Sequence, residues 1–144
     1  MNIFNKKSKF DYQLLGEGVE AGISLKGAEA KSIREGRGDI SKSFVKIVGN
    51  EAFLVNANIP ASGVANYDST RTRKLLLHKA EILSLLTKMK QRKLQIVPLK
   101  LYNKGRLVKL YLELGKPKHK FEKREAIKKK DIDRDIEREL KNSF

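Results

Sequence analysis

Short runs in which apolar and polar residues alternate recur along the chain and predict β-strands. The clearest is 106–114, where four apolar side chains fall on one face of an extended strand: Val108, Leu110, Leu112 and Leu114. Asn103-Lys104-Gly105, which is typical of a hairpin turn, separates this run from another at 94–102. A second hairpin is expected around Gly49-Asn50. These patterns predict antiparallel strands with one buried and one solvated face.

Two further extended segments follow from the same pattern. The second arm of the Gly49-Asn50 hairpin, residues 52–59, alternates so that Asn56 and Asn58 face solvent. Its buried face is predicted to consist of four residues: Phe53, Val55, Ala57 and Ile59. Residues 10–25 are predicted to form a strand that bends or bulges near Gly16 and Gly18.

Helical spacing replaces alternation in two places. In 78–93 four apolar residues recur at helical intervals: Ile82, Leu85, Leu86 and Met89. A shorter helix is expected from Gly27 to Gly36, with Lys31 and Arg34 on its outer side. Short strands, glycine turns and one long helix are typical of a small closed or nearly closed barrel with helices outside it. The pattern does not separate an oligonucleotide-binding fold from other small barrels.

Composition adds a class of partner to this fold. The 144 residues hold 32 Lys and Arg against 17 Asp and Glu, a formal net charge of +15. Such a charge favours polyanions, and nucleic acid before a membrane surface. No apolar run approaches the roughly 20 residues of a spanning helix, and the N-terminus has no signal-peptide core. Since cysteine is absent, disulfides and thiolate metal sites are excluded. We expect a cytoplasmic protein.

The character of the chain changes near Gly115, and the sequence predicts three parts: a flexible N-terminus (1–9), an RNA-binding body (10–116) and a basic tail (117–144). From Gly115 onward there are 11 of the 32 cations and 7 of the 17 acids, a net +4, which leaves +11 for the body. The body should therefore bind RNA itself. Ile132, Ile136 and Leu140 give the tail one narrow apolar stripe, so we expect it to be disordered when free and helical on a partner. A plain basic tail that serves solubility is the alternative.

The sequence gives little support for catalysis. It contains no Gly-x-Ser-x-Gly, Gly-Lys-Ser/Thr phosphate loop or His-Glu-x-x-His motif. His78 and His119 lie in different segments with no evident carboxylate relay. Asp131, Asp133 and Asp135 stand among lysines, where ion pairs within a helix explain them more simply than a metal site. We therefore predict no enzyme, no catalytic residue, no metal and no cofactor.

The most distinctive stretch is Asp68-Ser69-Thr70-Arg71-Thr72-Arg73-Lys74-Leu75-Leu76-Leu77. Its hydroxyls can donate hydrogen bonds and its guanidinium groups match phosphate oxygens, while the leucines would anchor the cations to a core. The stretch resembles the D-P-T-R-T-R-K-L-L-L signature of the SmpB (small protein B) family, the tmRNA-binding proteins of bacterial trans-translation, with Ser69 in place of proline. Five other segments follow the family pattern in order: Glu20–Ile23, Gly27–Arg34, Glu51–Leu54, Pro98–Tyr102 and Lys123-Arg124.

This resemblance covers nearly the whole chain and implies a function. It implies an OB-like closed antiparallel β-barrel with flanking helices, which binds the tRNA-like domain of tmRNA and delivers it to stalled ribosomes. Together with the charge pattern it indicates ten RNA-binding residues: Glu20, Lys31, Arg34, Thr70, Arg71, Thr72, Arg73, Lys74, Leu76 and Lys109. The chemistry of Leu76 alone suggests a core anchor instead. Lys109 is predicted to face solvent, in agreement with its implied role.

The resemblance also assigns the tail to the ribosome, at the decoding centre and its small-subunit RNA. Eight residues are expected to contribute: Lys116, Lys118, Phe121, Lys123, Arg124, Lys128, Ile132 and Ile136. Pro117 and Glu122 depart from the family pattern. Elongation factor Tu and alanyl-tRNA synthetase are expected as partners only indirectly, through tmRNA, and the protein is expected to be a monomer. Two alternatives are a generic single-stranded nucleic-acid-binding barrel and a basic ribosome-associated structural protein.

Overall fold

The computed structural model describes residues 2–118, 124 and 134. Its body is one antiparallel sheet with the strand order β1-β6-β7-β2-β5-β4-β3. The strands are β1 (Ile3–Phe4), β2 (Tyr12–Ile23), β3 (Phe44–Val48), β4 (Glu51–Val55), β5 (Arg73–Leu76), β6 (Gln95–Lys104) and β7 (Leu107–Pro117). The helices of the described part are α1 (Ser8–Asp11), α2 (Gly27–Arg34) and α3 (Lys79–Arg92).

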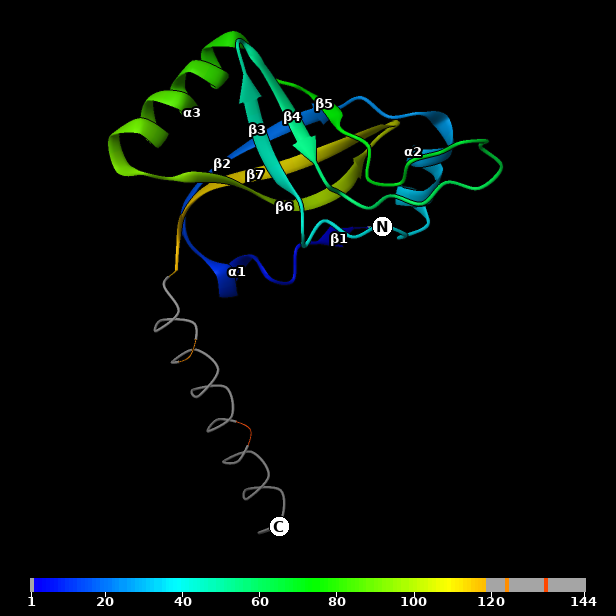
Figure 1. Cartoon of the computed structure of the whole chain (residues 1–144), viewed down its shortest axis with the longest axis horizontal. Helices are drawn as coiled ribbons and strands as arrows, with labels where there is room; N and C mark the ends of the chain where they lie inside the picture. Colours follow the sequence, from blue (N-terminus) through cyan, green and yellow to red (C-terminus); the bar gives the residue numbers. More distant parts are fainter. Residues whose placement is uncertain (1, 119–123, 125–133, 135–144) are drawn as a thin grey trace.

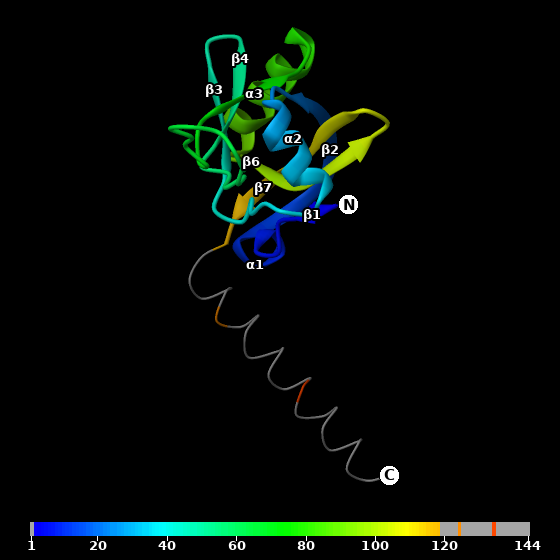
Figure 2. The ribbon, with the colours of Figure 1, turned by 90° about the vertical axis from the view of Figure 1, so that its right-hand side faces the viewer.

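The sheet curls into a half-barrel, with α2 near one end and α3 beside the β3–β4 hairpin (Figures 1 and 2). It is open, because β1 and β3 form its two edges and are not paired with each other. The prediction of a mostly-β fold with helices is confirmed. The closed barrel is not confirmed, since the strand order does not return to its start. None of the helices in the described part of the chain is long and apolar enough to span a membrane.

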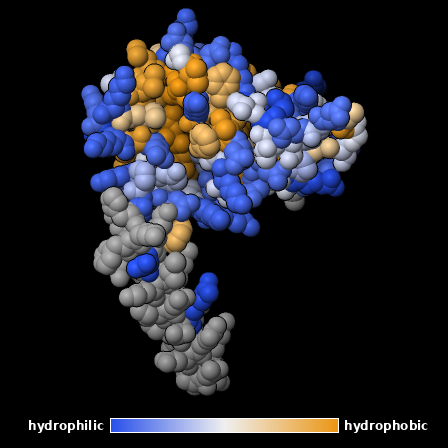
Figure 3. Space-filling view, in the orientation of Figure 1, coloured by the Kyte–Doolittle hydropathy of each residue, from blue (hydrophilic) through white to orange (hydrophobic). Residues whose placement is uncertain are grey.

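The core lies on the inner face of the curl. Leu110, Leu112 and Leu114 of β7 are at most 1 % exposed, as the alternation predicted. Ile33 from α2 and Leu85 from α3 join the same core cluster. Both expected hairpins and both expected helices are present, within a few residues of the predicted bounds. Figure 3 shows that hydrophobic surface also remains on the outside, over the β3–β4 hairpin and toward α3.

One predicted face is partly wrong. In β4 the buried residues are Ala52 and Leu54, and Phe53 and Val55 point the other way. The reason is Asn56, whose φ of 64° is left-handed and interrupts the alternation. Beyond this residue Ala57 and Ile59 are buried, as predicted. The alternation of side chains between the two faces of a strand therefore does not continue unchanged across such a residue.

The predicted bend in β2 is confirmed. Its register with β7 shifts between Leu14 and Gly18, and Gly16 has a left-handed φ of 80°. Gly18 is needed for a different reason, because a Cβ there would lie 1.9 Å from the Tyr111 hydroxyl. The absence of a side chain at Gly18 therefore lets the Tyr111 ring lie directly against the β2 backbone.

Residues 2–9, which the sequence predicts to be flexible, contribute β1 and the start of α1. Ile3 is 7 % exposed and pairs with Leu101 of β6. The buried Asn5 side chain donates a 2.8 Å hydrogen bond to the Pro98 carbonyl. These contacts fasten the N-terminal segment along the edge of the sheet.

Candidate nucleic-acid interface

The face of the sheet opposite the core, called the outer face below, carries four of the ten residues expected to bind RNA: Glu20, Lys74, Leu76 and Lys109. Directly paired residues of antiparallel strands share a face, so the register assembles cross-strand rows. One row runs Glu20, Tyr111, Lys100 and Phe4 across β2, β7, β6 and β1. The next runs Leu76, Gly22, Lys109 and Tyr102 across β5, β2, β7 and β6. Residues far apart in sequence thus meet on one surface.

Glu20, Leu76 and Lys109 line a single hollow of about 610 Å³ on this face. Its walls come from β2, β5, β7, the β3–β4 turn and the start of α3. Lys74 and Lys79 add two cations to its lining. Glu51 and Glu81 join Glu20 in the lining, so the hollow, called the outer-face hollow below, combines apolar, basic and acidic groups from five elements.

The structure overturns the interpretation of Leu76 as a core anchor. Arg73–Leu76 form strand β5, which is paired with β4 on one side and β2 on the other. Alternation along β5 buries Leu75, which is 2 % exposed, and leaves Leu76 58 % exposed. A Cβ at Gly22 would lie 3.1 Å from the Leu76 Cβ, so Leu76 lies over this glycine.

Glu20 is engaged within the protein. It accepts a short hydrogen bond from the Tyr102 hydroxyl and a 3.2 Å bond from Lys104 Nζ. The bond from Tyr102 is the main cause that lowers the pKa of Glu20. Burial and the Glu20 carboxylate raise the pKa of Tyr102 to about 12. Lys100 Nζ lies 4.7 Å from the centre of the Tyr102 ring. Glu20 thus orients an aromatic ring and a lysine beside the outer-face hollow.

Arg73 is placed differently from the expectation that it offers a fork to phosphate. Its side chain is 0 % exposed, and its Nη2 lies 2.7 Å from Oε2 of Glu29, which is also 0 % exposed. Arg73 also donates to the Ala57 carbonyl at 2.7 Å and the Ser69 carbonyl at 2.9 Å. Its donors are directed into the protein, so Arg73 holds the chain in position.

Glu29 is the centre of this buried network. Arg71, whose side chain is 28 % exposed, also pairs with it through a short contact and a 3.1 Å bond from Nε. The Tyr67 hydroxyl lies 2.8 Å from Oε2, and the Lys26 backbone N–H lies 2.8 Å from Oε1. Burial by itself raises the pKa of Glu29, but the hydrogen bonds from Arg71, Lys26, Tyr67 and Arg73 outweigh it and lower the pKa to about 2.

These contacts shape residues 68–72, called the Thr-Arg loop below. Asp68 accepts 3.0 Å hydrogen bonds from both the backbone N–H and the hydroxyl of Thr70, which lower the pKa of Asp68. Thr70 and Thr72 are exposed and Arg71 is half-buried. The loop therefore presents two hydroxyls and part of one guanidinium group to solvent. Its backbone is held by the hydrogen bonds of Asp68 and Arg73.

The remaining predicted residues lie elsewhere. Lys31 and Arg34 are exposed on α2, where Arg34 donates a 3.0 Å bond to the Arg106 carbonyl. Lys116 is exposed after the end of the core, and Lys118 Nζ donates to the Lys9 carbonyl at 2.8 Å. Arg124 is exposed. Five tail residues lie outside the described residues: Phe121, Lys123, Lys128, Ile132 and Ile136.

Sequence reasoning missed several contributors. His78 and Lys79 line the outer-face hollow because α3 begins there, with His78 as N-cap and Glu81 closing a capping box. Glu29 was also missed, although a signal exists: it lies four residues before the buried Ile33, on the same side of α2. Within the described residues no group of three His, Cys, Asp or Glu side chains could hold a metal ion.

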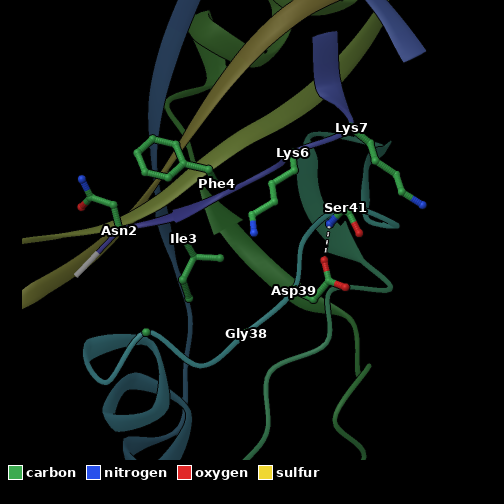
Figure 4. A pocket seen from close by; sticks show the side chains of 9 residues that line it. Asn2, Ile3, Phe4, Lys6, Lys7, Gly38, Asp39 and Ser41 are labelled. Atoms are coloured by element: carbon green, nitrogen blue, oxygen red, sulfur yellow. Dashed lines mark hydrogen bonds between the residues drawn. The ribbon is translucent and has the colours of Figure 1, made fainter. Parts of the chain in front are cut away.

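A second hollow, of about 530 Å³, lies between the N-terminal segment and the loop after α2. Figure 4 shows Lys6 and Lys7 on one side and Asp39 and Ser41 on the other. Asp39 accepts hydrogen bonds from the hydroxyl and backbone N–H of Ser41, and both lower the pKa of Asp39. None of the predicted RNA-binding residues lines this hollow.

A fold of this kind with a basic outer face is that of a small nucleic-acid-binding protein, and the comparisons give its family. The family model described as "SmpB protein" matches residues 2–142, and the chain belongs to this family. An SsrA-binding protein of Mesoplasma florum is 50% identical, over 95% of this chain and 94% of that one. One from a Sulfurihydrogenibium species is 50% identical, over 97% of this chain and 93% of that one.

A solved structure gives the same assignment. A chain from "tmRNA-SmpB: a journey to the center of the bacterial ribosome" is 40% identical and has a TM-score of 0.70. The match covers 88% of this chain and 94% of that chain. The resemblance described from the motifs of the sequence is therefore confirmed along nearly the entire length.

Proposed function

We propose that the protein binds tmRNA, through its tRNA-like domain, and brings it to stalled ribosomes in trans-translation. Family membership and the SsrA-binding names of its relatives support this function. One structural observation assigns RNA binding to a particular surface of the protein. Three residues from three strands, Glu20, Leu76 and Lys109, meet at one hollow that also contains lysines.

The chemistry of the outer-face hollow suits a folded RNA. Lys74, Lys79 and Lys109 supply charges for phosphates that approach from different directions. The exposed Leu76 supplies an apolar contact for the face of a base or ribose. Three acids also line the hollow. Glu20 is turned toward Tyr102 and Lys104, Glu51 forms a weak surface pair with Lys74, and Glu81 caps the start of α3. Such a surface recognises shape and backbone more than base identity.

The Thr-Arg loop and α2 form the second part of the proposed site. Thr70, Arg71 and Thr72 reach the surface there, and the exposed Lys31 and Arg34 lie on α2, to which Glu29 ties the loop. In this proposal Arg73 contributes by holding the loop, because its side chain is 0 % exposed. A rigid loop loses less conformational freedom on binding, which favours affinity.

The finer assignments are proposals of the same kind. The tail from residue 117 would contact small-subunit RNA at the decoding centre, while the body contacts tmRNA. Elongation factor Tu and alanyl-tRNA synthetase would act on the same tmRNA without binding the protein, which would be a monomer in the cytoplasm. RNA binding in this proposal involves no catalysis.

A competition experiment tests the function. Labelled tmRNA bound to the protein is titrated with unlabelled tmRNA, transfer RNA and random single strands, all at one salt concentration. The proposed function predicts that tmRNA displaces the label at the lowest concentration. If random single strands compete equally well, the protein is a generic single-stranded nucleic-acid-binding protein and the proposal is wrong.

A further inference from the structure

We propose that the outer face of the β3–β4 hairpin is a stacking platform for an unpaired base of the bound RNA. Its central residues are Phe44 and Phe53, and neither these nor Lys46 belongs to the site proposed above. The inference rests on the proposed function, because it extends the same RNA surface by two strands.

The first argument is a cross-strand row. Phe53 of β4 pairs with Lys46 of β3 on one side and with Lys74 of β5 on the other. The three side chains therefore share the outer face, with the aromatic ring between two cations. An aromatic ring can stack on a base while neighbouring lysines contact the phosphates on either side of it.

The second argument is exposure. Phe44 lies two residues before Lys46 on the same face of β3 and is 48 % exposed, so its ring is accessible to a ligand. β3 is an edge strand, so no further strand limits access from that side. The hydrophobic surface over this hairpin is visible in Figure 3.

The third argument is continuity with the outer-face hollow. Lys74 belongs to the row of Phe53 and also lines that hollow, as do Asn50 and Glu51 of the same hairpin. Lys74 Nζ lies 3.4 Å from the Glu51 carboxylate, and both side chains are about half exposed at 49% and 54%. A surface pair of this kind is weak, so Lys74 remains available to a phosphate.

The charges favour RNA over a protein strand as the occupant. A protein segment that covered the Phe53 row would have to desolvate Lys46 and Lys74 and supply an acid for each. RNA supplies a negative charge at every nucleotide and an aromatic face at every base. The platform therefore fits a nucleotide that leaves the helical stack of a folded RNA.

Leucine substitutions test the platform without removing apolar packing. The double variant Phe44→Leu/Phe53→Leu keeps two apolar side chains but loses both rings, and Lys46→Ala removes one cation. Val48→Ala is the matched control, because Val48 is on the same strand, outward-facing and 55% exposed. Dissociation constants for tmRNA are measured over a series of salt concentrations, and melting temperatures confirm that each variant folds.

The proposal predicts a separation of two effects. The double leucine variant should bind about tenfold more weakly with an unchanged salt dependence, because stacking is lost and phosphate contacts are kept. Lys46→Ala should lower the slope of log affinity against log salt by roughly one unit. Val48→Ala should behave as the wild type.

A folded double leucine variant that binds tmRNA as tightly as the wild type would overturn the proposal. If that variant also loses binding to ribosomes, the platform serves a different partner. Failure of the proposed function is seen separately, in the wild-type protein, as equal competition by random single strands.

Discussion

Neutralising Glu29 should destabilise the whole body of the protein. The Glu29 side chain is 0 % exposed and pairs with Arg73, which is 0 % exposed, and with Arg71. Glu29→Gln keeps the size of the side chain but leaves a buried guanidinium group without its counter-charge. Removal of one partner from a buried pair costs about 3–5 kcal/mol. The lowered pKa of Glu29, from 4.5 to about 2, corresponds to about 3 kcal/mol.

Thermal unfolding followed by circular dichroism measures this cost. For a chain of this size about 3 kcal/mol corresponds to a melting temperature lower by roughly 10 °C. Glu35→Gln is the matched control, because Glu35 forms only a 3.4 Å surface pair with Arg37, with side chains 42% and 60% exposed. Its effect should be below about 0.5 kcal/mol. A Glu29→Gln protein that melts within about 2 °C of the control would refute the buried network.

The same residue gives a pH dependence of defined sign. Because the folded-state pKa of Glu29 is lower than its usual 4.5, its contribution is fully present above about pH 5 and is lost as the pH falls toward 2. The stability difference between wild type and Glu29→Gln should therefore shrink over this range. Denaturant titrations at several pH values measure it, and a constant difference would contradict the assigned ionisation.

Three further predictions concern the interface and the tail. Leu76→Ala should keep the wild-type melting temperature and weaken tmRNA binding about tenfold, whereas Leu75→Ala should cost about 2–5 kcal/mol of stability; the reverse pattern would restore Leu76 to the core. Lys109→Ala should lower the salt slope of tmRNA binding by roughly one unit, and an unchanged slope would remove Lys109 from the phosphate contacts. A chain that ends at Lys118 should bind tmRNA but fail to support peptide tagging on stalled ribosomes, and tagging that survives would refute the role of the tail.

The sequence predicted the elements and their buried faces correctly where the alternation or helical spacing of apolar residues was uninterrupted. Alternation over 106–114 predicted the buried face of β7 and the outward position of Lys109 correctly. Helical spacing predicted α3 to within a residue or two. The alternation in β4 failed because a left-handed Asn56 shifts the phase. Asparagine adopts this conformation more readily than most residues, but Asn58 has the same residue type, so the type alone does not locate the shift.

Contacts between distant segments were not predictable in the same way. The motif around Arg71 and Arg73 suggested two surface forks, yet a carboxylate more than forty positions earlier, Glu29, turns one of them inward. Four residues make too short a run to reveal β5 as a strand, so its pairing with β2 and β4 could be known only from the structure. The exposure of Leu76 follows from that pairing. The open sheet likewise depends on which strands form the edges.

Backbone NMR of the protein with and without the tRNA-like fragment of tmRNA tests the central claim most directly. The outer face is predicted to be the RNA surface, so the largest amide shifts on binding should fall on β2, β5 and β7 around Gly22, Leu76 and Lys109. Residues at the hollow of Figure 4, such as Asp39 and Ser41, should shift little. Shifts concentrated at Asp39 and Ser41, with the outer face unchanged, would contradict the account.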